Sequence, residues 1–150
     1  MTEPRTGIEI DMVVKDSIKA LTLYERIFEI HRFEVANFGK GLSEVFFTMY
    51  GGRFHLLDEN PDYFMFAPKD GEIKSIWMNV FVPDISKTFE KALTTGCTVI
   101  RRVTEMTEFG VSNAMFADPF GYNWMLHQIH REVSFEERNK IFKEKLGDGR

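Results

Sequence analysis

The sequence has a single cysteine, and this scarcity limits the chemistry available to the chain. One thiol cannot form an intramolecular disulfide, nor can it build a thiolate metal site by itself. Cys97 opens the β-branched run Thr98 to Ile100, a position typical of a small buried residue. The sequence therefore indicates a reducing compartment and a structural role for Cys97.

Long apolar runs and an excess of positive charge are also missing. No apolar run approaches the roughly 18 residues needed to cross a bilayer, and the first residues show no basic segment followed by an apolar one. The net charge of −4 disfavours non-specific binding to nucleic acid, which needs a positive surface. We expect a cytoplasmic protein that has neither nucleic acid nor membrane as a partner.

Several catalytic motifs are absent from the sequence as well. It contains no glycine-rich strand-to-helix loop of the kind that holds nucleotides, phosphates or S-adenosylmethionine. It has no G-x-S-x-G elbow of a serine hydrolase and no C-x-x-C or H-E-x-x-H metal motif. Phenylalanine, in contrast, is abundant, with 15 residues in 150. Most of these rings must form a core, but aromatic residues also line pockets for small organic ligands.

The chain reads as one domain made of two similar halves. Residues 13–28 and 81–96 both run from apolar strand residues through an aspartate into an amphipathic helix. Asp16 or Ser17 can cap the first helix, and Asp84 or Ser86 the second. Three strand-like segments follow each helix, so each half reads β-α-β-β-β.

Glycine and proline mark the turns between these elements. Gly51-Gly52 can form a two-residue hairpin turn with positive φ angles, and Asp118-Pro119-Phe120-Gly121 matches a type I turn position by position. The predicted boundaries are, in order: module one at about residues 7–59, a linker at 60–74, module two at about 75–130, and a C-terminal helix at about 134–146.

The C-terminal helix has its own start and stop signals. Ser134 with Glu137 makes a capping box, and Gly147 can end the helix. Its apolar residues are expected to pack against the body of the protein or against a partner subunit. They are Phe135, Ile141, Phe142 and Leu146.

The paired modules, with "VVKD" and "VPD" entering the two helices and "DPFG" before the last strand, resemble the vicinal oxygen chelate superfamily of glyoxalases, bleomycin-resistance proteins and dioxygenases. Within it, "VFFTMYGGRFHLLDENPDY" and "ADPFGYNWMLHQIHREVSFEE" are most similar to the PhnB-like branch. The resemblance implies an α+β fold in which two modules form a curved mixed β-sheet cup with flanking helices. It also implies a homodimer, with modules paired within or between chains and a small-molecule ligand inside the cup.

Metal-dependent relatives place their ligands on four strands, and the resemblance carries these positions onto Glu9, His55, Trp77 and Met125. An indole cannot bind a metal, and a thioether is a poor ligand for ions that prefer oxygen and nitrogen. We therefore expect no metal and no other cofactor.

Strand alternation predicts which further side chains face the cup. The expected ligand-binding set is Glu9, Asp11, His55, Trp77, Asn79, Met125 and His127. Each of these residues could also have a purely structural role. Glu9 could be a solvated acid at the end of a strand, and His55 and His127 could be hydrogen-bonded structural histidines. Trp77 and Met125 could pack in the core. Asp11 is costly within an apolar strand unless it is solvated or paired. The candidate catalytic residues are Glu9, Asp11 and His55.

Three functions remain open at this point. The first is a metal-independent protein that binds a small, partly aromatic or hydrophobic molecule in a cup at a dimer interface. The second is a metal-assisted or acid/base lyase, isomerase or dioxygenase of the glyoxalase type. The third is a non-catalytic dimer whose function is association or regulation. The aromatic linker residues Tyr63, Phe64 and Phe66 are its candidates for an exposed partner surface or a lid.

Overall fold

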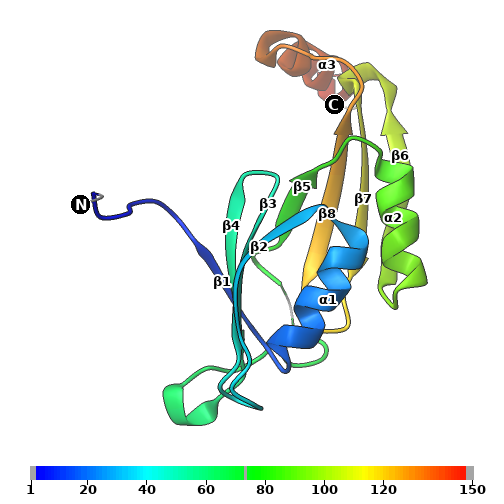
Figure 1. Ribbon diagram of the computed structural model, residues 1–150. Helices are drawn as coiled ribbons and strands as arrows, with labels where there is room; N and C mark the ends of the chain where they lie inside the picture. The colour runs from blue at the N-terminus through cyan, green and yellow to red at the C-terminus, as the bar shows by residue number, and fades with distance from the viewer. Residues whose placement is uncertain (1–2, 73, 148–150) are drawn as a thin grey trace.

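The computed structural model describes residues 3–72 and 74–147, and it shows two four-stranded mixed sheets with three α-helices. The first sheet has the order β1-β4-β3-β2 and the second the order β5-β8-β7-β6 (Figure 1). The strands are β1 Ile10–Val14, β2 Ile30–Ala36, β3 Glu44–Met49, β4 Gly52–Asp58, β5 Met78–Phe81, β6 Thr98–Met106, β7 Val111–Ala117 and β8 Asn123–Ile129. In each sheet the first strand pairs in parallel with the last, and the other pairs are antiparallel. The predicted α+β class and the two β-α-β-β-β units are confirmed.

The helices α1 (Ser17–Ile27) and α2 (Ile85–Thr94) begin at the two predicted aspartates. Asp16 accepts a hydrogen bond from the backbone N–H of Lys19 at 3.0 Å, and Asp84 accepts one from the backbone N–H of Lys87 at 3.1 Å. Aspartate therefore caps both helices, as the first of the two alternatives predicted.

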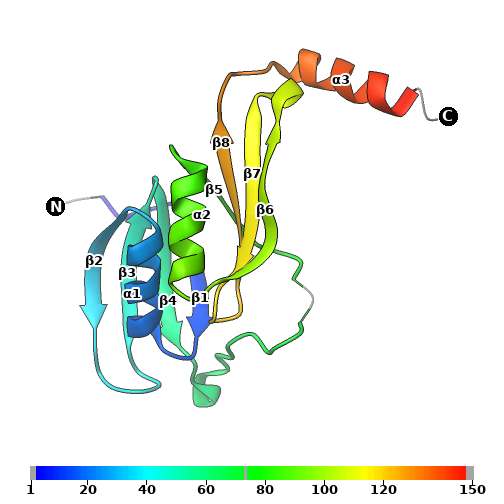
Figure 2. The same ribbon diagram turned by 90° about the vertical axis from the view of Figure 1, so that its right-hand side faces the viewer.

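A single apolar core lies between the two modules and unites them. The helices α1 and α2 lie side by side (Figures 1 and 2). The Trp124 indole of β8 is fully buried. Its ring centroid lies 5.1 Å from that of Tyr24 in α1 and 5.1 Å from that of Phe28 directly after α1. The Phe54 ring of β4 also packs near Trp124, with 6.4 Å between the ring centroids. Each sheet thus turns one face to a core built from both halves of the sequence.

The β3–β4 hairpin turns one residue earlier than the glycine pair predicted. Tyr50 and Gly51 take the positive φ angles, 46° and 84°, and Gly52 already pairs with Met49 as the first residue of β4. This register sets Phe47 opposite Phe54, whose rings stack 5.2 Å apart. A Cβ on Gly52 would lie 3.3 Å from the Phe54 ring, so the second glycine serves close packing and not the turn.

Asp118 occupies the predicted turn before β8 and is almost completely buried. Its Oδ1 accepts hydrogen bonds from the backbone N–H groups of Phe120 and Tyr122, at 2.8 and 3.0 Å. Its Oδ2 accepts from the Tyr24 hydroxyl at 2.5 Å and from the Trp124 indole N–H at 2.8 Å. Because Tyr24 belongs to α1, this carboxylate ties module two to module one.

The C-terminal helix α3 (Phe135–Gly147) lies beyond one end of the second sheet (Figure 1). Ser134 Oγ accepts a hydrogen bond from the backbone N–H of Glu137 at 3.1 Å, as the capping box predicts. Only part of the expected apolar packing is seen. The ring centroid of Phe142 lies 5.0 Å from that of Phe109 in the 3-10 turn η2 (Thr107–Phe109). Phe135 and Leu146 remain exposed.

The linker contains a short 3-10 turn, η1 (Pro61–Tyr63), and residue 73 of the linker lies outside the described residues. Tyr63, Phe64 and Phe66 are exposed, as expected. Among the described residues, no helix has the length and apolar character needed to span a membrane.

We predict that Asp118→Asn destabilises the fold by about 3 kcal/mol, because an amide N–H₂ would face the Tyr24 hydroxyl and the Trp124 indole N–H and leave buried donors unsatisfied. Urea denaturation followed by circular dichroism measures the change. Asp70→Asn, in an exposed turn, is the matched control and should change stability by less than about 0.5 kcal/mol. Equal stability of the two variants would contradict this role for Asp118.

Candidate functional site

The predicted cup residues lie on the sheet faces that point away from the shared core. Along β4, His55 lies between the core residues Phe54 and Leu56 on the opposite face, where it is itself buried. Along β8, Met125 alternates with the buried residues Trp124 and Leu126. The parallel pairing sets Asp11 beside His55 in the first sheet and Asn79 beside Met125 in the second. Glu9 and Trp77 lie directly before β1 and β5 and not within them.

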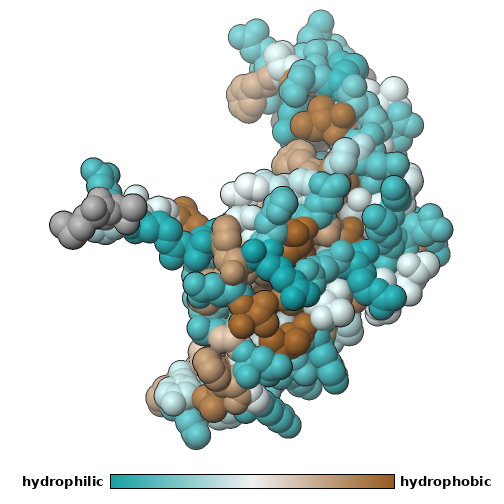
Figure 3. Space-filling view, in the orientation of Figure 1, coloured by the Kyte–Doolittle hydropathy of each residue, from teal (hydrophilic) through white to brown (hydrophobic). Residues whose placement is uncertain are grey.

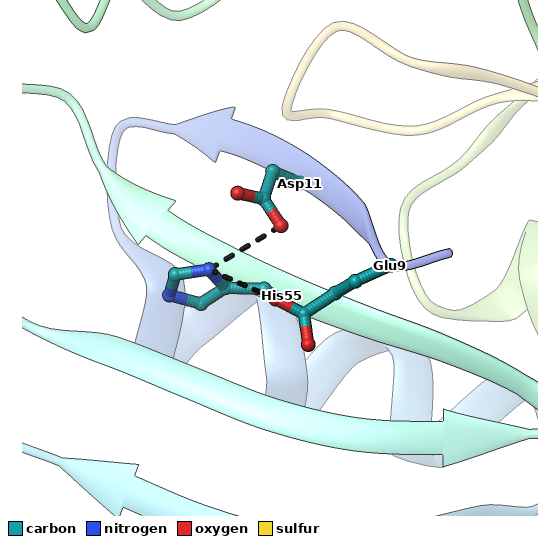
Figure 4. Close-up of side chains that lie close together, drawn as sticks. All are labelled: Glu9, Asp11 and His55. Atoms are coloured by element: carbon teal, nitrogen blue, oxygen red, sulfur yellow. Dashed lines mark ion pairs between the residues drawn. The ribbon is translucent and has the colours of Figure 1, made fainter. Parts of the chain in front are cut away.

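The face of module one carries a compact acid–imidazole cluster (Figure 4). His55 Nδ1 lies 3.4 Å from Asp11 Oδ1 and 3.6 Å from Glu9 Oε1. The side chain of Asp11 is more than half exposed, so the acid in this strand is both solvated and close to a potential cation. The three residues expected to act as catalytic groups are therefore neighbours in space.

Three residues that the sequence analysis missed complete this cluster. His55 Nε2 lies 3.2 Å from Glu44 Oε2, and the His55 ring stacks on Phe46 with 4.0 Å between centroids. Arg53 forms an ion pair with Glu9, and mainly through this hydrogen bond it lowers the pKa of the Glu9 carboxyl. Glu44, Phe46 and Arg53 come from neighbouring strands at the same face, and the β3–β4 register could have identified them.

The face of module two lines a cavity of about 580 Å³. Asn79, Met125 and His127 all belong to its wall, as the strand alternation predicted, and Phe81 and Ile129 join them. The C-terminal helix α3 contributes Arg138 and Phe142. The wall thus combines thioether, aromatic and aliphatic groups with an amide, an imidazole and several guanidinium groups.

His127 is held in one orientation by its neighbour on β5. Its Nδ1 donates a hydrogen bond to Asn79 Oδ1 at 2.6 Å, since a carbonyl oxygen can only accept, and in the neutral ring this leaves Nε2 as an acceptor. Burial lowers the pKa of His127 below its ordinary value of 6.5, and the positive charges of Arg101 and Arg138 lower it further. The imidazole is therefore neutral at pH 7.

The two halves of the predicted cup lie along separate hollows of the single chain. The wall of the 580 Å³ cavity comes entirely from residues 79–142, whereas Glu9 and Arg53 line a hollow of about 300 Å³ next to Arg5. Trp77 lies in a third hollow, where Phe54 and Phe81 are also found. Figure 3 shows apolar patches across the middle of the molecule.

Of the four positions that the family resemblance assigns to metal ligands, two carry side chains that are poor ligands for such ions. Trp77 offers an indole and Met125 a thioether, and neither suits a hard or borderline divalent ion. Glu9, Asp11 and His55 do offer one ligand atom each within 4.8 Å of one another. However, Oε2 of the Glu9 carboxylate already pairs with Arg53 and Arg5, so two guanidinium groups lie beside this cluster and oppose a further cation.

Comparison with known proteins places this arrangement in a family. Residues 8–126 match the model of the Glyoxalase/Bleomycin resistance protein/Dioxygenase superfamily. The chain belongs to this superfamily. Uncharacterized proteins of Mycobacterium bovis and Mycobacterium tuberculosis are 34% identical to it over 62 residues, which is 41% of this chain. The matched segment spans 40% of the M. bovis protein and 36% of the M. tuberculosis protein.

Solved structures share the fold at low sequence identity. The fosfomycin resistance protein FosX from Listeria monocytogenes, complexed with Mn(II) and sulfate, has a TM-score of 0.64 and 16% identity, with 95% of this chain and 99% of that chain covered. A PhnB protein from Bacillus cereus has a TM-score of 0.59 and 16% identity, with 82% of this chain and 99% of that chain covered. TioX from Micromonospora sp. ML1 has a TM-score of 0.61 and 14% identity over 86% and 100%.

We predict that His127 titrates below pH 6.5 and that Arg101→Gln raises its pKa, because a repelling charge is removed. The lowered folded-state pKa means that this group costs stability as the pH falls below 6.5 and none above it. An NMR titration of the histidine Cε1–H signals measures both effects. Arg102→Gln, at the next position of β6 and outside the cavity wall, should leave the His127 pKa unchanged.

Proposed function

We propose that this protein is a metal-independent, PhnB-like member of the superfamily that binds a small organic molecule against the cup face of module two. The single observation that carries the proposal is the 580 Å³ cavity lined by Asn79, Phe81, Met125 and His127. Its volume lies within the usual range of small-molecule sites. Apolar walls with a few convergent polar groups are also typical of such sites.

The same proposal includes a homodimer in which module one of a second copy covers this cavity. Large side chains stay exposed on the cup faces, with Phe81 at 53% and Trp77 at 43% of their full accessible area. Exposed apolar area of this kind favours association with another surface. The faces also differ in charge: Glu9, Asp11 and Glu44 lie on module one, and arginines line the cavity of module two. A face of one module against the opposite face of a second copy would therefore be complementary.

Metal independence follows from the residues that occupy the ligand positions of the metal-dependent relatives. Met125 and Trp77 stand where the resemblance expects coordinating groups, and Met125 adds a thioether to the apolar wall of the cavity. Two polar groups of the cavity wall, Asn79 and His127, are hydrogen-bonded to each other. They orient a ligand by hydrogen bonds and not by coordination.

We expect ligands found in a thermal-shift screen of metabolites to bind Phe81→Ala about tenfold more weakly than the unchanged protein, because about 1.4 kcal/mol of apolar contact is lost. Isothermal titration calorimetry measures the affinity. Phe38→Ala, at an exposed ring in the β2–β3 loop, is the matched control and should bind normally. A screen without ligands, or equal affinities of the two variants, would remove the proposal.

The metal and dimer parts of the proposal have separate tests. Elemental analysis of protein purified without chelators should give far less than one equivalent of Zn, Mn, Fe or Ni per chain, and light scattering should give twice the 17.5 kDa chain mass. One equivalent of metal that is lost on His55→Ala would refute metal independence. A monomer at micromolar concentration would refute the shared cup.

The acid–imidazole cluster of module one favours a second candidate, an acid/base lyase, isomerase or dioxygenase of the glyoxalase type. Glu44 Oε2 and Asp11 Oδ1 flank the two nitrogens of His55 at 3.2 and 3.4 Å, an arrangement that can hold and pass on a proton. If this candidate is correct, His55→Gln should lower turnover of a cup ligand by at least about a hundredfold while the ligand still binds. Product analysis by mass spectrometry with each screened ligand is the measurement.

A further inference from the structure

We infer that the cavity of module two selects organic anions that also carry a hydrogen-bond donor, such as hydroxylated aromatic acids. The inference rests on the proposed small-molecule site and adds the chemical class of its ligand. It comes from three features of the cavity wall: arginines without carboxylate partners, a buried amide with an unsatisfied atom, and a neutral imidazole.

Two guanidinium groups of the wall have no carboxylate partner among residues 3–72 and 74–147. Arg101 of β6 and Arg138 of α3 both line the cavity and form no ion pair there, whereas Arg131 is paired with Glu137 at 3.7 Å. Glu132 is the carboxylate of the described wall. The cavity therefore has an excess of positive charge, although the whole chain carries −4. Arginine binds carboxylate and phosphate groups with two parallel hydrogen bonds, so an anionic ligand fits this excess.

The amide of Asn113 supplies an independent sign of a missing ligand. Asn113 lines the cavity with 7% of its surface accessible, and its Oδ1 has no hydrogen-bond partner. Its Nδ2 donates to Met106 Sδ at 3.1 Å, and a thioether is a weak acceptor. A buried carbonyl oxygen without a donor costs stability, and a hydroxyl or N–H of a ligand that reaches it would remove that cost.

The wall also contains a second acceptor and a large apolar surface. His127 donates from Nδ1 to Asn79, so Nε2 of the neutral ring can accept from the same kind of ligand hydroxyl. The apolar part of the wall includes Phe81, Met106, Phe109, Val111, Met125 and Ile129. An aromatic or aliphatic ring would contact these groups while its acid reaches the arginines.

Another explanation for the arginines is that they face the acidic face of a second copy in the dimer. Glu9 already pairs with Arg53 and Arg5, and Glu44 lies against His55, so Asp11 is the acid of that face that is most open to a new partner. This explanation leaves Asn113 unsatisfied. It also predicts that loss of the arginines leaves the ligand preference unchanged, which separates it from the inference.

The test uses three acids, 3-hydroxybenzoate, 4-hydroxyphenylacetate and 6-hydroxy-2-naphthoate, each compared with the matching neutral alcohol and with the acid that lacks the ring hydroxyl. Calorimetry on the full-length protein should give at least one acid that binds about tenfold more tightly than both of its analogues. Arg101→Gln and Arg138→Gln should each remove the preference for the acid, and Asn113→Ala the preference for the hydroxyl. Arg102→Gln should change neither.

The outcomes separate the inference from the proposed function. Alcohols that bind as tightly as the acids would overturn the inference and leave the small-molecule site standing. Acids that fail to bind at all would overturn the inference, and the metabolite screen would then decide on the site alone. If Arg101→Gln dissociates the dimer in light scattering without changing ligand preference, the arginines serve subunit contact and the inference is wrong.

Discussion

The buried carboxylate of Asp118 is the interaction on which the relation between the two modules depends. A desolvated charge is tolerated only when its lone pairs are filled, and here four donors fill them. Two of the donors close the turn before β8, one is the indole at the centre of the core, and one is a hydroxyl from the first helix. Burial and the Asp118 charge raise the pKa of Tyr24 well above its ordinary value, so Tyr24 stays a donor. The turn, the core and the contact between modules are thus coupled through one side chain.

Because this coupling stabilises the core, the sheet faces that point away from the core are not needed to hold the modules together. Phe54 and Trp124 face the core, so their neighbours His55 and Met125 must face away from it. The two cup faces have diverged in chemistry although their strands are equivalent. Where module one pairs Asp11 with His55, module two pairs Asn79 with Met125. A site built from both kinds of face would have proton-transfer groups on one wall, and apolar groups with guanidinium groups on the other.

The sequence was sufficient for those parts of the structure that depend on local patterns. The aspartate caps, the two β-α-β-β-β units and the alternation that sends Asn79, Met125 and His127 to one wall all follow from spacing along the chain. The sequence was insufficient wherever a partner from another strand decides the outcome. The hairpin turn lies one residue earlier than predicted because Phe47 stacks on Phe54. The spacing of residue types along the chain does not reveal this pairing register of β3 and β4. Glu44 and Arg53 were missed for the same reason, since they reach His55 and Glu9 across strands.

Under the proposed function, the apolar side chains Trp77 and Met125 and the arginines of the cavity wall are physically connected. A divalent ion at the centre of a cup supplies positive charge that can hold an anionic ligand, and a cup without such an ion needs another source of charge. Arg101 and Arg138 supply it from the rim of the cavity. Because guanidinium groups bind through directional donors, they attract an anion without the Lewis acidity that polarises a bound oxygen. Under the proposed function, such a cup recognises its ligand through these groups, and any acid–base step falls to the His55 cluster of a facing module.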